Sequence, residues 1–442
     1  MNTTTATNTE NHILLNEQES FSAVAGNHSS FLNEIRTQAA ARFNEMGIPS
    51  AKHEEWKYVP LAVLTKINFK AIPPTGAFKL SKADAERFRI AGKEAVLVVI
   101  ENGRLNKNAS NVNGLPKGVT IGSLADLAAD PRVKLHLTKH AETEHEPFVA
   151  LNTAMLFDAA IVLIDDAVIF DRPIQLIHLS DGEHHAVAVA ARTLVVAGKN
   201  SQCAIVESYH TLNDRHAVFT HAVSEVVVGE NAKMQYAKIQ DERENAHHIS
   251  YHKINQSKNS EQHIHTITLG GALVRNNLNI CLDDVNCSTY LNGLYILNGT
   301  QVVDNHTLVD HAKPHCYSNE LYKGIIDGKA QGVFNGKIFV RKDAQKTNAY
   351  QSNKNILLSN DASMNAKPQL EIYADDVKCS HGATTAQPDG EALFYLRARG
   401  IGETNAKALL NHAFAADVIG RIEMESLKES LLEMLSRKLL EH

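Results

Sequence analysis

Cys379 and His381 stand two positions apart in the segment VKCSHGATTAQPDG, residues 377–390. If this segment is a strand, alternate side chains share a face, so the thiol and the imidazole point the same way and Ser380 points the opposite way. Three roles fit such a pair: ligands of a shared metal site, a nucleophile with its base, or polar residues that fill a sheet. Spacing alone favours the structural role. The nucleophile ranks last, because no oxyanion hole is evident.

A second group of metal-ligating residue types lies in VDNHTLVDHAKPHCYSNE, residues 303–320. Pro314 argues against a helix here, so a helical H-x-x-x-H zinc site is disfavoured. His311 and His315 are an even number of residues apart and could share one face of a strand, or His315 could sit at a corner of the fold. We rank His311, His315 and Cys316 as weak metal candidates.

Composition restricts the class of protein. The chain has 442 residues, of which 43% are hydrophobic and 21% charged, which is typical of a soluble globular protein with two or three domains. A net charge of −6 gives no general reason to expect nucleic acid or an anionic membrane as a partner. Apolar runs such as Ala159–Ile164 are too short to span a bilayer, and the N-terminus has no targeting signature, so we expect a cytoplasmic location.

The five cysteines are scattered, and no C-x-x-C motif occurs. A disulfide framework and a private four-cysteine metal cluster are therefore both disfavoured. Any metal chemistry would be shared with histidines or with a partner chain.

Short polar triplets recur through the middle of the chain, between strand-like runs rich in Val, Ile, Thr and Tyr. They begin 31, 28, 27, 29 and 28 residues apart, at Asn200, Asn231, Asn259, Asn286, His315 and Asp343. A related triplet at Lys329 falls half an interval before Asp343, as if each repeat had two corners. A repeat of this length predicts a β-helix over roughly 160–385, with a β-sandwich as the alternative.

The rest of the chain completes a mainly β fold flanked by helices. We predict a disordered lead-in over 1–28, a mostly helical (α+β) domain over 29–155, the β-helix core over 156–388 and a helical domain over 389–442. The helical segments are expected to cap the ends of the solenoid. In the last domain, Leu409, Leu410 and Phe414 share a helix face that suits either an intramolecular hairpin or protein docking.

Several stretches, taken together, resemble a known family. They are the gapless stretch 334–385, LFYLRARGI at 393–401, ALLNHAF at 408–414, EEWKY at 54–58 and ALNTAM at 150–155. This set resembles the SufB/SufD family, the scaffold proteins of the SUF iron–sulfur cluster assembly machinery. The resemblance implies a right-handed parallel β-helix between helical domains, and a non-enzymatic role.

The resemblance also implies partners and site residues. SufB would pair through the β-helix, and the ATPase SufC would dock on the face of Leu409, Leu410 and Phe414 and supply the nucleotide hydrolysis. His381 would be an iron ligand or cluster-positioning group at the SufB junction, with Cys379 as its lesser partner. For the complex, the resemblance suggests three cofactors: iron, a nascent iron–sulfur cluster and a reduced flavin.

Three departures indicate the SufD branch of this family. Gly382 follows His381 where SufB-like chains carry glutamate, Asn353 stands where they carry an essential cysteine, and the first cysteine here is Cys203. Two other classes stay open: a carbohydrate-active β-helix enzyme, suggested by the pairs Asp283–Asp284 and Asp375–Asp376, and a free-standing metalloprotein. Exposed solenoid surface would also allow a homodimer in isolation.

Overall fold

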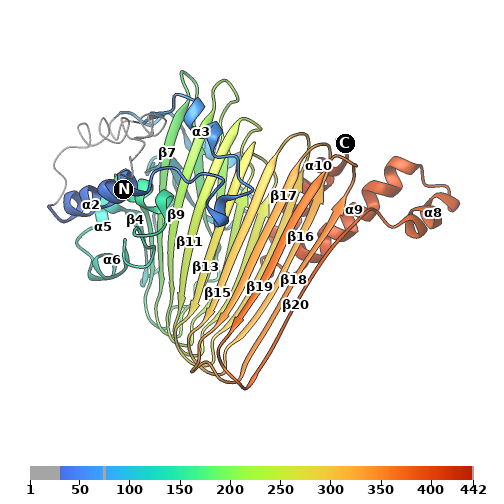
Figure 1. The fold of residues 1–442 in the computed structure, drawn as a ribbon. Coiled ribbons are helices and arrows are strands. Elements are labelled where there is room, and N and C mark those ends of the chain that lie inside the picture. Colours follow the sequence, from blue (N-terminus) through green and yellow to red (C-terminus); the bar gives the residue numbers. More distant parts are fainter. Residues whose placement is uncertain (1–29, 73–75, 441–442) are drawn as a thin grey trace, which may run out of the picture.

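The protein is built around two ten-stranded sheets that face each other (Figure 1). The computed structural model describes residues 30–72 and 76–440, so the predicted lead-in over 1–28 lies outside the described residues. Sheet A contains β4 (Val119–Ser123), β5 (Ala160–Ile164), β7 (Val187–Ala197), β9 (Val218–Val228), β11 (Ala246–Gln256), β13 (Leu273–Leu282), β15 (Val302–His311), β17 (Gln331–Val340) and β19 (Ser363–Ile372), with β1 (Lys70–Ala71) beside β7.

Sheet B contains β3 (Arg104–Leu105), β2 (Val96–Glu101), β6 (Ile174–Ser180), β8 (Gln202–Thr211), β10 (Lys233–Gln240), β12 (Glu261–Thr268), β14 (Ser288–Leu297), β16 (Tyr317–Ile326), β18 (Thr347–Leu357) and β20 (Val377–Ala386). From β5 to β20 the chain alternates between the sheets, and neighbours within each sheet are parallel. Each coil therefore contributes one strand to each sheet. The predicted parallel β-helix is confirmed, and the β-sandwich is not.

The corners follow from residues that tolerate a left-handed backbone. Asn200, Asn231, Asn259 and Asn286 have φ angles of 55–59°, a region that asparagine enters more readily than most residues. Their side-chain amides form a ladder, in which Asn231, Asn259 and Asn286 each donate to the asparagine of the preceding coil at 2.9–3.1 Å. His315 continues the column with φ 61°.

The last predicted corner, at Asp343, does lie in the connection between β17 and β18, but Asp343 is not its left-handed residue. The left-handed residue is Lys346, with φ 62°. The connection from β17 to β18 has six residues, whereas that from β15 to β16 has five, so the turn falls later than the repeat predicts. On the opposite side of the coils, Gly299 and Gly328 have φ angles of 61° and 63°, and Lys329 follows the second. This confirms two corners per coil.

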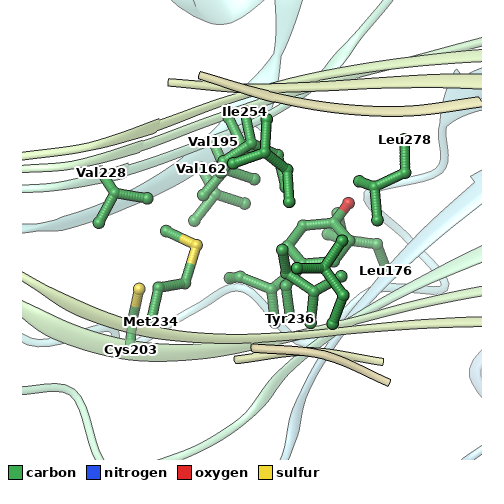
Figure 2. Close-up of a cluster of buried hydrophobic side chains, with 14 of the residues drawn as sticks. Val162, Leu176, Val195, Cys203, Val228, Met234, Tyr236, Ile254 and Leu278 are labelled. Atoms are coloured by element: carbon green, nitrogen blue, oxygen red, sulfur yellow. The ribbon is translucent and has the colours of Figure 1, made fainter. Parts of the chain in front are cut away.

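The space between the sheets is filled by inward-facing side chains. Val162, Val195, Val228, Ile254 and Leu278 from sheet A face Leu176, Cys203, Met234 and Tyr236 from sheet B (Figure 2). All are buried, so each coil obtains its core by stacking on its neighbours. Gly293 and Gly324 each lie beneath the ring of a tyrosine in the adjacent strand, Tyr322 and Tyr295 respectively, where a Cβ atom would overlap the ring.

The N-terminal helices are α2 (Ser30–Met46), η2 (Glu54–Trp56), α3 (Ala62–Lys66), α4 (Lys82–Glu86), α5 (Leu124–Leu127), α6 (Pro131–His136) and α7 (Pro147–Ala154). Trp56 is buried against Phe148 of α7, with a ring-centroid distance of 5.2 Å, and the Arg275 guanidinium lies 4.2 Å from its ring. Trp56 thus anchors the segment of η2 against α7 and the solenoid. Strands β2 and β4 extend the two sheets into residues before 156.

The C-terminal helices are α8 (Gly390–Ala398), α9 (Glu403–Ile419) and α10 (Glu425–Leu440). Helices α9 and α10 pack their apolar stripe on the outer face of sheet B, through Val418, Ile419, Leu427, Leu431 and Leu435. The expectation that they cap the end of the solenoid is wrong, because the apolar surface that they cover lies on its flank. No helix within 30–72 or 76–440 is long and apolar enough to cross a membrane.

Candidate functional site

The solenoid ends in a coil that no further part of the described chain covers. Strand β20 pairs with β18 alone, and β19 pairs with β17 alone. Eight of the ten residues of β20 are exposed, whereas seven of the ten in β17 are buried. The inward face of this last coil is therefore accessible from the end of the solenoid.

Cys379 and His381 lie on that face. Both are in β20, opposite Ala349 and Gln351 of β18, which are buried inward-facing residues. Cys379 is half-buried against the small apolar cluster around Ala349, and this burial raises the pKa of its thiol. His381 is exposed. The strand assignment behind the sequence argument is thus correct, and the two side chains share one face.

A polar column leads inward from His381. Gln351 is its neighbour in the ladder, and the Gln351 amide donates to the carboxylate of Glu320 at 2.8 Å. Glu320 is buried, and burial raises its pKa to about 7. An exposed imidazole and a half-buried thiol at an open end can supply two ligands to a metal ion and leave the remaining positions to another molecule.

The predicted docking residues on α9 differ in exposure. Leu409 is 52% exposed and Leu410 is half-buried. Phe414 packs on the solenoid, where the Lys323 ammonium lies 4.4 Å from its ring and forms an ion pair with Asp417 at 2.7 Å. Leu409 is therefore the one of the three whose side chain is mainly available to another molecule.

Helix α8 is a surface that the sequence argument missed. None of its residues is buried, and Phe394 and Tyr395 are 74% and 56% exposed. The helix projects beyond the solenoid at the C-terminal end (Figure 1). Leu393-Phe394-Tyr395-Leu396 is a run of four apolar residues, more than one face of a short helix can bury, and this was the available signal.

Comparisons with known proteins agree with this architecture. The model of the SUF system FeS cluster assembly SufBD core domain matches residues 178–414, and that of the SufBD N-terminal region matches 7–176. The chain belongs to the SufBD family. It is 36% identical to a SufBD family protein of Synechocystis over 93% of this chain and 92% of the relative. It is 32% identical to the Escherichia coli iron–sulfur cluster assembly protein SufD over 89% of this chain and 90% of the relative.

Two of the departures noted in the sequence, Asn353 and Gly382, can now be placed in this SufBD chain. Asn353 is buried in the lumen, and its amide donates to the Tyr295 hydroxyl at 3.1 Å. It therefore fills a structural place in the core. A Cβ atom at Gly382 would meet nothing within 4 Å, so packing does not require glycine next to His381.

The weak metal candidates do not come together in this SufBD chain. The Nε2 of buried His311 is hydrogen-bonded to Ser318 at 2.9 Å, and burial lowers its pKa to about 4. His315 is exposed at its corner, and Cys316 is buried next to it. Across the part of the chain that the structure describes, no group of three or more His, Cys, Asp or Glu side chains has an arrangement that could hold a metal ion.

Proposed function

We propose that this chain is a non-enzymatic, SufD-type scaffold subunit of the SUF complex. It pairs with SufB through the end of its β-helix and with the ATPase SufC through its C-terminal helices. It contributes to iron acquisition and nascent cluster assembly at the SufB junction, where His381 is the principal ligand or positioning group and Cys379 its lesser partner. Family membership favours this role over the carbohydrate-active enzyme and the free-standing metalloprotein.

The observation that carries this proposal is the open last coil. It exposes the edge of β20, and an exposed strand edge is a surface on which another chain can pair. Three large apolar side chains are exposed near the same end: Tyr350 of β18 and Ile372 and Tyr373 at the end of β19. A thiol and an imidazole beside such a junction suit an iron ion whose other ligands come from the partner.

The role of His381 predicts a specific defect. In a complex reconstituted from this chain, SufB and SufC, His381→Ala should remove most of the iron and acid-labile sulfide that the wild-type complex acquires. Among the described residues, the exposed imidazole has no hydrogen-bond or ion-pair partner that its removal would orphan, so stability should change by no more than about 0.5 kcal/mol. Iron and sulfide assays on the purified complex measure the effect.

Ser380→Ala is the matched control, because Ser380 is an exposed residue of the same strand on the opposite face. It should leave the iron and sulfide content unchanged. Normal cluster assembly in the His381→Ala complex would contradict the assignment of His381 as an iron ligand or positioning group. Size-exclusion chromatography of both variants separates loss of a ligand from loss of SufB pairing.

The ATPase contact is proposed for the surface formed by α8 and the exposed part of α9. Phe394 and Tyr395 give it two large aromatic side chains, and Leu409 adds a third apolar group. Aromatic side chains are over-represented among the residues that dominate binding energy in protein interfaces. This surface extends the docking face deduced from sequence onto a neighbouring helix.

The double substitution Phe394→Ala and Tyr395→Ala should weaken SufC binding by at least about 30-fold, equivalent to the loss of about 2 kcal/mol from an aromatic hot spot. Titration calorimetry with purified SufC measures this. Leu135→Ala is a matched control, since Leu135 is 66% exposed in α6, outside the C-terminal helices. Unchanged SufC affinity in the double variant would remove α8 from the interface.

A further inference from the structure

Two buried cysteines occupy equivalent positions in consecutive coils. They lie away from the end of the solenoid that carries Cys379. Cys287 follows the left-handed corner residue Asn286, and Cys316 follows the left-handed corner residue His315. The ladder between β14 and β16 begins at the next position, Ser288 opposite Tyr317. The two cysteines are therefore neighbours, one register step before this ladder.

The separation of such neighbours suits a disulfide. Adjacent strands lie about 4.8 Å apart, and Cα atoms joined by a disulfide are usually about 4.4–6.8 Å apart. The amide of Tyr317 donates to the Cys287 carbonyl at 2.8 Å, so the sheet spacing is maintained up to the corner.

The two thiols also share a neighbour. Both sulfur atoms lie close to the carbonyl oxygen of Asp284, at 3.1 Å from Cys287 and 3.3 Å from Cys316. Both side chains point inward and have no exposed surface. The corner thus holds a preassembled pair of thiols on the same side of the chain.

A purely steric role for cysteine does not account for this pairing. In the other coils the residue after the corner is also buried and small, at Ser201, Ala232, Ser260 and Thr347. Serine or alanine therefore satisfies the packing requirement. Cysteine occupies this position in two coils, and those two coils are adjacent.

We propose that Cys287 and Cys316 are a redox modification site, at which peroxide forms a disulfide that joins two consecutive coils. This inference is independent of the proposed scaffold role. The Cys287 thiolate attacks the O–O bond of hydrogen peroxide and becomes a sulfenic acid, releasing hydroxide. The Cys316 sulfur then attacks the sulfenic sulfur, forming the S–S bond and releasing water. Two thiols lose two electrons and two protons, and one peroxide becomes two water molecules.

The pKa shifts of the two thiols assign the order of attack. The Cys316 side chain lowers the pKa of Cys287 in spite of burial, whereas the Cys287 side chain and burial raise the pKa of Cys316. The thiolate is the reactive form, so Cys287 reacts first. The flanking corner residues Asp283, Asn286, Lys313 and His315 are exposed, so opening of the corner alone would admit a molecule as small as peroxide.

The experiment counts thiols in the full-length chain. The protein is treated with hydrogen peroxide, quenched with catalase, denatured and alkylated with a maleimide. The five thiols of the untreated chain should fall to three, and a thiol reductant should restore five. Peptide mapping should identify one cross-linked pair that contains Cys287 and Cys316. Retention of all five thiols, or a cross-link between any other pair, would overturn the proposal.

Serine variants complete the test, since Ser201 and Ser260 show that serine fits this position. Cys287→Ser should keep four thiols before and after peroxide. Cys316→Ser should fall from four to three, because its Cys287 stops at the sulfenic acid, and Cys379→Ser should fall from four to two. Dimedone should trap a sulfenic acid in Cys316→Ser but not in Cys287→Ser. Formation of an intramolecular disulfide in either corner variant, or dimedone labelling confined to Cys287→Ser, would contradict the proposal.

Discussion

Glu225→Ala is expected to lower the free energy of unfolding by about 3–5 kcal/mol, the loss typical of a broken buried ion pair. Glu225 of β9 and Arg192 of β7 are both buried, and the guanidinium lies 2.6 Å from the carboxylate. The same carboxylate accepts from the backbone N–H groups of Thr138, His140 and Ala141. Its removal leaves a buried charge and three unsatisfied donors.

The pKa of Glu225 also indicates that its carboxylate is charged and paired in the folded protein. Burial would raise the pKa of Glu225, but the Arg192 charge and the three backbone donors outweigh it and hold the pKa below its usual value. The carboxylate is therefore ionised in the folded protein at neutral pH. It holds the segment that leads into α7 against sheet A, so its loss should release that segment first.

Urea denaturation followed by circular dichroism measures the effect of Glu225→Ala. Glu230→Ala is the matched control, because its ion pair with Lys199 is exposed, with 3.4 Å between the charged atoms, and should contribute less than about 1 kcal/mol. Arg192→Met in the Glu225→Ala background should recover part of the loss, since it removes the unpaired charge. Equal effects of Glu225→Ala and Glu230→Ala would contradict this account.

Glu320→Gln is expected to stabilise the protein by about 3 kcal/mol at pH 8 and to have almost no effect near pH 4. Burial raises the pKa of Glu320 from 4.5 to about 7, and each unit corresponds to about 1.4 kcal/mol. Among the described residues, no cation forms an ion pair with this carboxylate. Gln351 donates to it and could equally donate to the oxygen of a glutamine amide.

The direction of the pH dependence follows from proton binding. Between pH 4.5 and about 7 the folded protein keeps the Glu320 proton, whereas the unfolded chain has released it. The folded wild type therefore loses stability as the pH rises through this window, and the glutamine variant does not. Below the window both states are protonated, so the two proteins converge.

Denaturant titrations of wild type and Glu320→Gln at several pH values test this prediction. Glu371→Gln supplies a control at a partly exposed glutamate, which forms an ion pair with Lys337. Its effect should stay within about 1 kcal/mol at every pH. A difference between wild type and Glu320→Gln that does not change with pH would disprove the buried protonated state.

The architecture was largely predictable from sequence because corners depend on single residues. The asparagines from Asn200 to Asn286 mark coils directly, since few other residues accept their backbone conformation. In the last corner the left-handed residue is Lys346 and not Asp343, because this connection is one residue longer than the one before it, which a repeat of residue types cannot reveal. The placement of α9 and α10 depends on which apolar surface they cover, and that is decided by tertiary packing with sheet B.

The candidate site was predictable only in part. Strand periodicity was enough to place Cys379 and His381 on one face, because both fall within β20. It could not show that this strand closes the last coil, which depends on where stacking stops. Similarly, the period of α9 grouped Leu409 with Phe414, but the contact between Phe414 and Lys323 comes from a strand almost a hundred residues earlier.

The last coil has one neighbouring coil instead of two, and this makes it the weakest part of the solenoid. Strands β19 and β20 each have hydrogen-bonded partners along one edge, and their side chains are the least buried of the array. In a stacked array, a terminal repeat opens at a lower free energy than an interior one. Fraying of the solenoid should therefore begin at the strand that carries Cys379 and His381. A molecule that binds the closed form of this coil also stabilises it, so recognition at this end is thermodynamically coupled to its folding.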